Sequence, residues 1–310
     1  MNHVKIFVSS MNPNLLGLTI NGYQLKKTLS YNEYKSSKEE DKKKLFYLID
    51  AKVFRGLFNF NSYPYKYYNK IQSASNLYIN DYNDYYYLYF EKIFSGSPLS
   101  YIHEQEHLVN SLRLYKSSNI GFFQPVDDNS AIFSDPARSF HAGHRGAVAE
   151  LFSLEAEEYD KIQNFYFQTF DWPKRPMAET IKKMLIFFHE SYRMESIVLR
   201  FLLRMIILEI LVDGIGDLSY RISRATAILL GKTETESRLL FKTVKSLYNA
   251  RSKYLHKGDM QSITIDMGYA ALEISRRIIA TLMYSDKSLD AVRQLLKESG
   301  YGSNPIGSID

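Results

Sequence analysis

The sequence contains no cysteine among its 310 residues. Disulfide bonds, thiolate metal sites and a cysteine nucleophile are therefore excluded, and a reducing cytosol is the simplest setting for the chain. The first residues, MNHVKIFVSS, have no apolar core of the length that a signal peptide needs. The most hydrophobic stretch, residues 197–212, carries Arg200, Arg204 and Glu209 and is shorter than the ~20 residues of a membrane-spanning helix. We therefore expect a soluble, cytoplasmic protein.

The composition is that of an ordinary globular protein, 45% hydrophobic and 24% charged. The first half of the chain alternates apolar and polar residues, as in LGLTINGYQLKK. There Asn21-Gly22 favours a two-residue type I′ hairpin that pairs Ile20 with Tyr23. The same hairpin would face Leu18 with Leu25. Four further stretches are strand candidates: VKIFVSS, KLFYLIDAKVF, YYYLYFEKIF and NSLRLYKSS.

The second half has helical periodicity. Helices are expected near residues 147–168, 177–191, 193–213, 217–231, 233–256, 262–284 and 288–299. The segment between the halves is rich in Pro, Asp, Asn, Ser and Gly, which is typical of a connection. We therefore predict an α+β protein with a β-rich domain at 1–125, a linker at 126–146 and a helical region at 147–310.

Two further features have more than one explanation. Many of the 25 tyrosines lie in the N-terminal half, at residues 63–89 in particular, and they could stack on nucleobases or serve as plain strand formers. His141 and His144 are close in sequence, but they lie in a glycine-containing loop with no obvious acidic partner. We interpret them as a polar loop and expect no metal site.

Residues 232–258 contain seven Lys or Arg and two Glu. Their local net charge of +5 equals the formal net charge of the whole chain. A basic helix in an otherwise balanced protein suits a polyanion such as RNA, although a solvated helix face has the same composition.

Arg251 lies in the middle of that helix, in YNARSKYLHKGD. An α-helix turns about 100° per residue, which places Leu247 and Leu255 about 40° to either side of Arg251 and Val244 about 20° away. A permanent cation is thus predicted at the centre of the apolar face.

Three explanations for Arg251 remain open. It pairs with a buried carboxylate, for which Glu209 is the candidate because Glu209 is itself placed in an apolar run. It belongs to a face that meets a second copy of the chain. Or it lines a cleft and holds a phosphate, which a guanidinium grips bidentately. The last two are compatible with each other.

His256 ends the same helix, and Gly258 is placed to form a left-handed cap. Histidine is the usual general acid or base near neutral pH. However, Arg251 and His256 are about 140° apart on an ideal helix. They can act together only if the last turn distorts or a second copy supplies part of the site.

The stretch from Tyr248 through Arg251-Ser252 to His256 resembles the R-x4-H signature of the HEPN superfamily (higher eukaryotes and prokaryotes nucleotide-binding), in its Apea-like branch. The upstream LEIL, which contains Glu209, is similar to an element common in that branch. The glycine comes one residue late, after Lys257. The resemblance covers about residues 177–300 and leaves the β-rich N-terminal domain unassigned.

This resemblance implies a homodimeric, metal-independent endoribonuclease without cofactors, in which two R-x4-H helices meet. Arg251 and His256 would be catalytic, with Ser252, Glu209 and Tyr248 supporting them. Lys253 and Lys257 would bind RNA phosphates.

The resemblance also implies a role as a defence or toxin-like effector, with the N-terminal domain as a sensor and an antitoxin or nucleotidyltransferase as a partner. Non-catalytic members of the same superfamily bind nucleotides or RNA, or only dimerise, and this is the main alternative. A sugar- or peptide-binding sensor with a helical dimerisation half is a third possibility.

Overall fold

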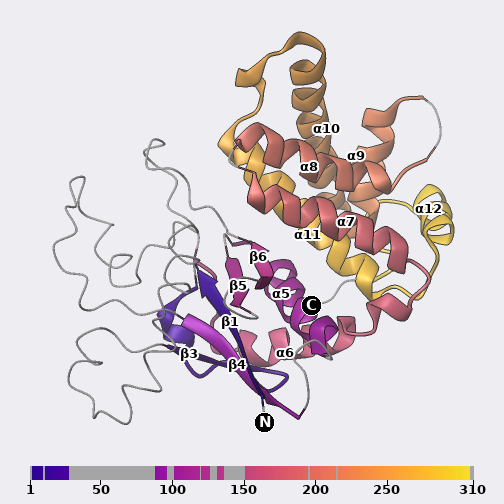
Figure 1. Cartoon of the computed structure of the whole chain (residues 1–310). Coiled ribbons are helices and arrows are strands. Elements are labelled where there is room, and N and C mark those ends of the chain that lie inside the picture. The colour runs from indigo at the N-terminus through magenta and orange to yellow at the C-terminus, as the bar shows by residue number, and fades with distance from the viewer. Residues whose placement is uncertain are drawn as a thin grey trace, which may run out of the picture. The chain divides into compact units, whose positions relative to one another are not determined.

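The computed structural model describes residues 2–9, 11–27, 88–95, 101–118, 120–125, 131–135, 151–194, 196–213 and 216–307. The predicted α+β class is confirmed: an antiparallel sheet in the first part of the chain is followed by a helical region (Figure 1). The chain forms two compact units, which are described separately. Unit 1 is Met1–Val109 with Ser118–Gln163, and unit 2 is Asn110–Ser117 with Asn164–Asp310.

Unit 1 contains the sheet. Its strands are β1 (Asn2–Ser9), β2 (Thr19–Ile20), β3 (Tyr23–Lys27), β4 (Leu88–Phe94), β5 (Gly121–Pro125) and β6 (Ala131–Asp135). Within the described ranges their order is β2-β3-β4-β1-β5-β6, and every neighbouring pair is antiparallel. Val4, Ile6 and Val8 of β1 are all buried, as the alternating pattern of β1 predicts. The predicted strands in VKIFVSS and in YYYLYFEKIF are therefore confirmed for their described residues, whereas KLFYLIDAKVF and the tyrosines at 63–87 lie outside them.

The predicted hairpin is also confirmed. Asn21 and Gly22 have φ angles of 48° and 76°, as a type I′ turn requires, and Ile20 pairs with Tyr23. The amide of Leu25 donates to the carbonyl oxygen of Leu18 over 2.8 Å. The local dipeptide thus determines the register of these two strands.

One predicted strand is wrong. The stretch NSLRLYKSS belongs largely to the helix α5 (Ile102–Tyr115). Leu112 and Leu114 alternate with polar residues, which is the pattern of a strand, but Arg113 between them is fully buried as well. Arg113 is accommodated because its Nη1 lies 2.8 Å from Nδ1 of His189 and its guanidinium lies 4.1 Å from the ring of Tyr192. Side chains on all sides of this part of the helix are buried, so its sequence lacks the apolar–polar periodicity of a surface helix.

Two boundaries also differ from the prediction. The first helix of the second half, α6 (Glu158–Thr169), begins well after residue 147, because Phe152 forms a bridge with Met11 and a turn follows. The Glu158 carboxylate accepts a hydrogen bond from the amide of Glu155 over 2.9 Å, which marks the true start of the helix. In addition, the predicted linker at 126–146 contains β6, which pairs with β5.

The helices of unit 2 begin and end within a few residues of the predicted positions. They are α7 (Ala178–Arg193), α8 (Ile197–Ile210), α9 (Leu218–Leu230), α10 (Glu234–Lys257), α11 (Ile265–Tyr284) and α12 (Leu289–Glu298). Five of them start after a side chain that accepts a backbone N–H three residues on: Ser196, Asp217, Thr233, Thr264 and Ser288. Helix α8 packs against both α7 and α11, and α10 packs mainly on α9 (Figure 1).

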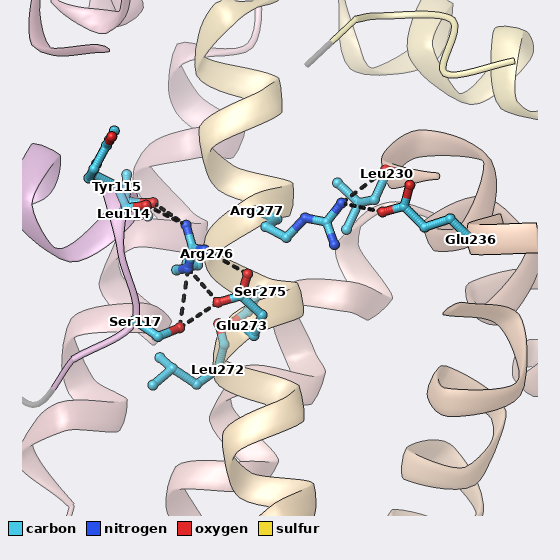
Figure 2. Close-up of polar contacts among 10 residues, drawn as sticks. All are labelled: Leu114, Tyr115, Ser117, Leu230, Glu236, Leu272, Glu273, Ser275, Arg276 and Arg277. Carbon is cyan, nitrogen blue, oxygen red and sulfur yellow. Dashed lines mark hydrogen bonds and ion pairs between the residues drawn. The ribbon is translucent and has the colours of Figure 1, made fainter. Parts of the chain in front are cut away.

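Arginines from neighbouring helices cap several helix C-termini in unit 2. Figure 2 shows two of them, adjacent on α11: Arg276 donates to the carbonyl oxygens of Leu114 and Tyr115 at the end of α5, each over 2.8 Å. Arg277 donates to the carbonyl oxygen of Leu230 at the end of α9, over 3.0 Å, and pairs with Glu236. The last carbonyls of a helix lack partners within it and carry partial negative charge, so a guanidinium satisfies both needs. Much of the arginine content of unit 2 is therefore structural.

Candidate functional site

The C-terminal half of α10 carries the residues that the sequence singled out. Arg251 forms an ion pair with Glu209 of α8, in which Nε lies 2.8 Å from Oε1 and Nη2 lies 3.2 Å from Oε2. Both side chains are 22% exposed. The ring of Tyr248, one turn earlier, lies 5.6 Å from the guanidinium carbon. Of the three predicted supporting residues, Glu209 and Tyr248 therefore contact Arg251.

This ion pair fixes the guanidinium without using all of its donors. The contact runs along the Nε and Nη2 edge, and Nη1 makes no hydrogen bond to a described residue. A guanidinium carries five N–H donors, so Arg251 can hold a second anion while Glu209 holds it in place. The pairing itself is the first of the three explanations that the sequence left open, and it is compatible with the other two.

Glu209 is also electrostatically unusual. Burial raises the pKa of its carboxyl group, and the positive charge of Arg251 opposes this shift only in part. The net direction is upward from the ordinary value of 4.5. Ionisation of Glu209 therefore favours the unfolded state. The stability that the protonated carboxyl group contributes is lost as the pH rises from 4.5 through the folded-state pKa.

We expect Arg251→Met to lower the free energy of unfolding by about 1–3 kcal/mol at pH 7, because it leaves a half-buried carboxylate unpaired. The double variant Arg251→Met/Glu209→Leu should recover to within about 1 kcal/mol of the wild type. Urea denaturation of the three proteins measures both effects.

The single variant should also lose stability more steeply than the wild type as the pH rises above 4.5, since nothing then opposes the burial of Glu209. In Arg251→Met/Glu209→Gln this additional slope should vanish. Equal stability of all variants at every pH would show that the pair has no energetic role.

His256 lies in the last turn of α10 and is exposed. The helix ends as predicted, at Gly258 with φ of 67°, whose amide donates to the carbonyl oxygen of Tyr254 over 2.9 Å. No described residue donates a hydrogen bond to the imidazole or accepts one from it. Ser252, predicted to orient this ring, is half-buried one turn earlier and makes no hydrogen bond to it.

The structure does not bring Arg251 and His256 together within one copy. Helix α10 is continuous from residue 234 to residue 257, so the two residues stay about 140° apart around its axis. The last turn does not distort, which leaves a second copy as the way to combine the two groups at one phosphate.

The apolar face of α10 ends earlier than predicted. Leu240, Val244, Leu247 and Ala250 are buried, but Leu255 is 50% exposed. Leu255 has the angular position of a core residue, but only half of its side chain is covered. Met260, in the turn η6 (Met260–Ser262) that follows, is 62% exposed. Two exposed apolar side chains, Leu255 and Met260, therefore lie close to His256 in the sequence.

The basic residues of α10 are arranged differently from the capping arginines. Lys242, Lys253 and Lys257 are exposed, and no described carboxylate pairs with them. Cations without internal partners attract an external polyanion more strongly than paired ones do. The predicted phosphate-binding residues Lys253 and Lys257 are therefore available for this role.

Arg204 is a residue of interest from outside the predicted set. Arg204 of α8 is buried, and it donates through Nε to the Ser191 hydroxyl over 3.2 Å and through Nη1 to the Gly268 carbonyl oxygen over 2.9 Å. Burial lowers its pKa to about 10. Its position in an apolar run was the sequence signal, but its partners are on other helices.

His141 and His144 lie outside the described residues. Among the residues that are described, no group of three or more His, Asp or Glu side chains gathers in a way that could hold a metal ion. Within the same ranges, no helix combines the length and the apolar character needed to cross a membrane.

Comparison of the chain with family models, curated proteins and solved structures finds no match. Its function is therefore argued from the geometry of α10 and from the resemblance of its residues to the R-x4-H pattern.

Proposed function

We propose that the chain is a metal-independent endoribonuclease of the HEPN type, whose site forms where the C-terminal ends of two α10 helices meet. The 2′-hydroxyl of RNA attacks the adjacent phosphorus, the bond to the 5′ oxygen breaks, and a 2′,3′-cyclic phosphate and a 5′-hydroxyl result. His256 transfers the proton, as the base that takes it from the 2′-hydroxyl or as the acid that gives one to the leaving oxygen. Arg251 stabilises the charge that develops on the phosphate oxygens.

One observation carries the proposal: a guanidinium positioned by Glu209 and Tyr248 keeps a free Nη1, on the same helix end as an exposed histidine and unpaired lysines. Positioning matters because electrostatic stabilisation works when the donor is already oriented before charge develops. Lys253 and Lys257 bind the backbone on either side of the scissile phosphate, and this binding weakens as salt increases.

A second copy completes the site. The separation of Arg251 and His256 around α10 requires the histidine of one copy to act with the arginine of the other, as a two-fold axis allows. The exposed Leu255 and Met260 supply apolar surface for such a contact.

In this proposal the protein acts in the cytoplasm as a defence or toxin-like effector, and the N-terminal unit responds to a trigger. A neighbouring antitoxin or nucleotidyltransferase restrains or modifies it. These roles come from the resemblance alone.

A non-catalytic RNA- or nucleotide-binding HEPN domain, or one that only dimerises, is the alternative, and one observation favours it. Glu209 already neutralises Arg251, so the guanidinium has less charge to offer a transition state, whereas the unpaired lysines still bind a polyanion. In that case RNA binds without being cut.

The test is incubation of end-labelled tRNA and total RNA with the purified protein in EDTA, followed by analysis of the product ends and of the oligomeric state. Cleavage that survives chelation and leaves cyclic phosphate ends is expected, from a dimer. Salt-dependent RNA binding without cleavage, or a monomer at micromolar concentration, would contradict the catalytic proposal.

A further inference from the structure

A pocket of about 260 Å³ lies in unit 2, between the end of α8, the first turns of α9 and the last turns of α12. Helices α8, α9 and α12 are labelled in Figure 1. Four cationic residues and one carboxylate line the pocket together with apolar side chains. The proposed nuclease site uses none of them.

Two of the four cations hold the walls together. Arg293 of α12 donates to the carbonyl oxygens of Ile210 and Leu211 at the end of α8, over 3.0 and 3.3 Å. Arg224 of α9 donates to the carbonyl oxygens of Leu296 and Ser299 at the end of α12, over 2.5 and 2.8 Å. These contacts cap helix C-termini and fix the shape of the pocket.

The other two cations share a single carboxylate. Arg221 lies 3.1 Å and Lys297 lies 3.5 Å from the same Oδ1 of Asp213. Neither has another partner among the described residues. Burial raises the pKa of Asp213, but the positive charges of Lys297, Arg293 and Arg221 lower it by more. The net pKa is below its ordinary value, so this carboxyl group is ionised at neutral pH. Arg221 and Lys297 thus share one internal anion.

The rest of the lining is apolar or aromatic. Leu211, Val212, Ala225 and Leu296 form this surface, and the ring of Tyr220, 46% exposed, lies beside it. Pockets that enclose drug-sized ligands measure about 300–1,000 Å³, so this one suits a smaller molecule. Apolar surface next to two cations fits a ligand with a charged head and an uncharged body.

We propose that this pocket binds a small organic phosphate with an aromatic or apolar body. The phosphate replaces Asp213 as the counter-ion of Arg221 and Lys297, because a dianion balances both charges and a guanidinium grips phosphate bidentately. The body lies against Val212 and the ring of Tyr220. This proposal does not depend on the nuclease proposal and is tested separately.

Calorimetric titration with phenyl phosphate tests the proposal, with inorganic phosphate as the probe that lacks the body. We expect saturable binding of phenyl phosphate, tighter than that of inorganic phosphate. Arg221→Gln and Lys297→Gln should each weaken it about tenfold. Asp213→Asn should strengthen it several-fold, because it removes the competing internal anion.

The matched control is Lys242→Gln, which removes the same charge from an exposed position on α10, outside the pocket. It should leave phenyl phosphate binding unchanged. Lys297 is 58% exposed on its side chain, so Lys297→Gln is expected to fold normally, and thermal unfolding of each variant checks this. The proposal is overturned if Asp213→Asn shows no saturable binding, if Asp213→Asn binds more weakly than the wild type, or if Lys242→Gln weakens binding as much as Lys297→Gln.

Discussion

His256→Ala is expected to reduce RNA cleavage in EDTA by about 10²–10⁴-fold, the range that a general acid–base group contributes. RNA affinity should change by less than about twofold, because the lysines that bind the RNA phosphates remain in place. The fold should be intact, since His256 is exposed and bonded to no described residue. Single-turnover cleavage and filter binding on the same preparation separate the two effects.

Arg251→Lys tests the role of the guanidinium group of Arg251. Lysine keeps a positive charge beside Glu209 but loses the fork that binds carboxylate and phosphate at once, so cleavage should fall strongly while stability falls less than in Arg251→Met. Lys253→Ala should instead weaken RNA binding and reduce its salt slope by about one.

Mixing the two inactive proteins tests whether the site is shared. If the arginine of one copy acts with the histidine of the other, each mixed dimer of Arg251→Lys and His256→Ala has one intact site. An equimolar mixture allowed to exchange subunits should then recover about a quarter of the wild-type rate. No recovery from a proven mixed dimer would place both residues in one copy, and undiminished cleavage by His256→Ala alone would remove this histidine from the mechanism.

The largest effect on stability is expected for Gly231→Ala. Gly231 is buried at the junction of α9 and α10, and a Cβ there would lie 2.2 Å from the Ser237 hydroxyl oxygen, 2.8 Å from the Ser237 Cα and 2.7 Å from the Ala227 carbonyl oxygen. Two of these atoms are backbone, so no side-chain rotation relieves the overlap. The free energy of unfolding should fall by about 3 kcal/mol or more, and the melting temperature by roughly 6 °C or more.

The same overlap affects the packing of the candidate site. The Ser237 hydroxyl donates to the Ala227 carbonyl oxygen over 3.0 Å and accepts from the Gly302 amide over 2.9 Å, so it joins α9, α10 and the C-terminal segment. Displacing it shifts the helix that carries Arg251 and His256. Cleavage is therefore expected to fall together with stability.

Gly300→Ala is the matched control, because a Cβ there meets no heavy atom within 4 Å. It should change the melting temperature by no more than about 1 °C. Gly231→Ala/Ser237→Ala should recover only part of the loss, since the Ser237 Cα and the Ala227 carbonyl remain in place. If Gly231→Ala were as stable as the control, the predicted overlap of its Cβ with Ser237 and Ala227 would be contradicted.

Local sequence was sufficient for the elements whose cause is local. Asn21-Gly22 specified a type I′ turn, and the turn set the register of the strands on both sides. Hydrophobic periodicity predicted the helices of unit 2, and Gly258 marked the end of α10. Even one long-range contact was predictable, because Arg251 and Glu209 each placed a charge in an apolar pattern and each needed a partner.

Tertiary structure decided what local patterns could not express. The strand-like alternation around Arg113 became helix because His189 and Tyr192, far along the chain, provide partners for a buried guanidinium. Leu255 has the angular position of a core residue but is half exposed, because angular position alone does not decide whether another element packs there.

The sequence by itself determined the α+β class, the helices of unit 2 and the residues at the end of α10 that resemble the R-x4-H pattern. Only the tertiary structure decided that Arg251 keeps a free edge beside Glu209, that other arginines cap helix ends, and that Arg221 and Lys297 meet at one carboxylate. The physical reason is the distance along the sequence over which each interaction acts. Helical propensity, capping and turn geometry act over a few residues, whereas the balance of buried charge depends on which helices pack together.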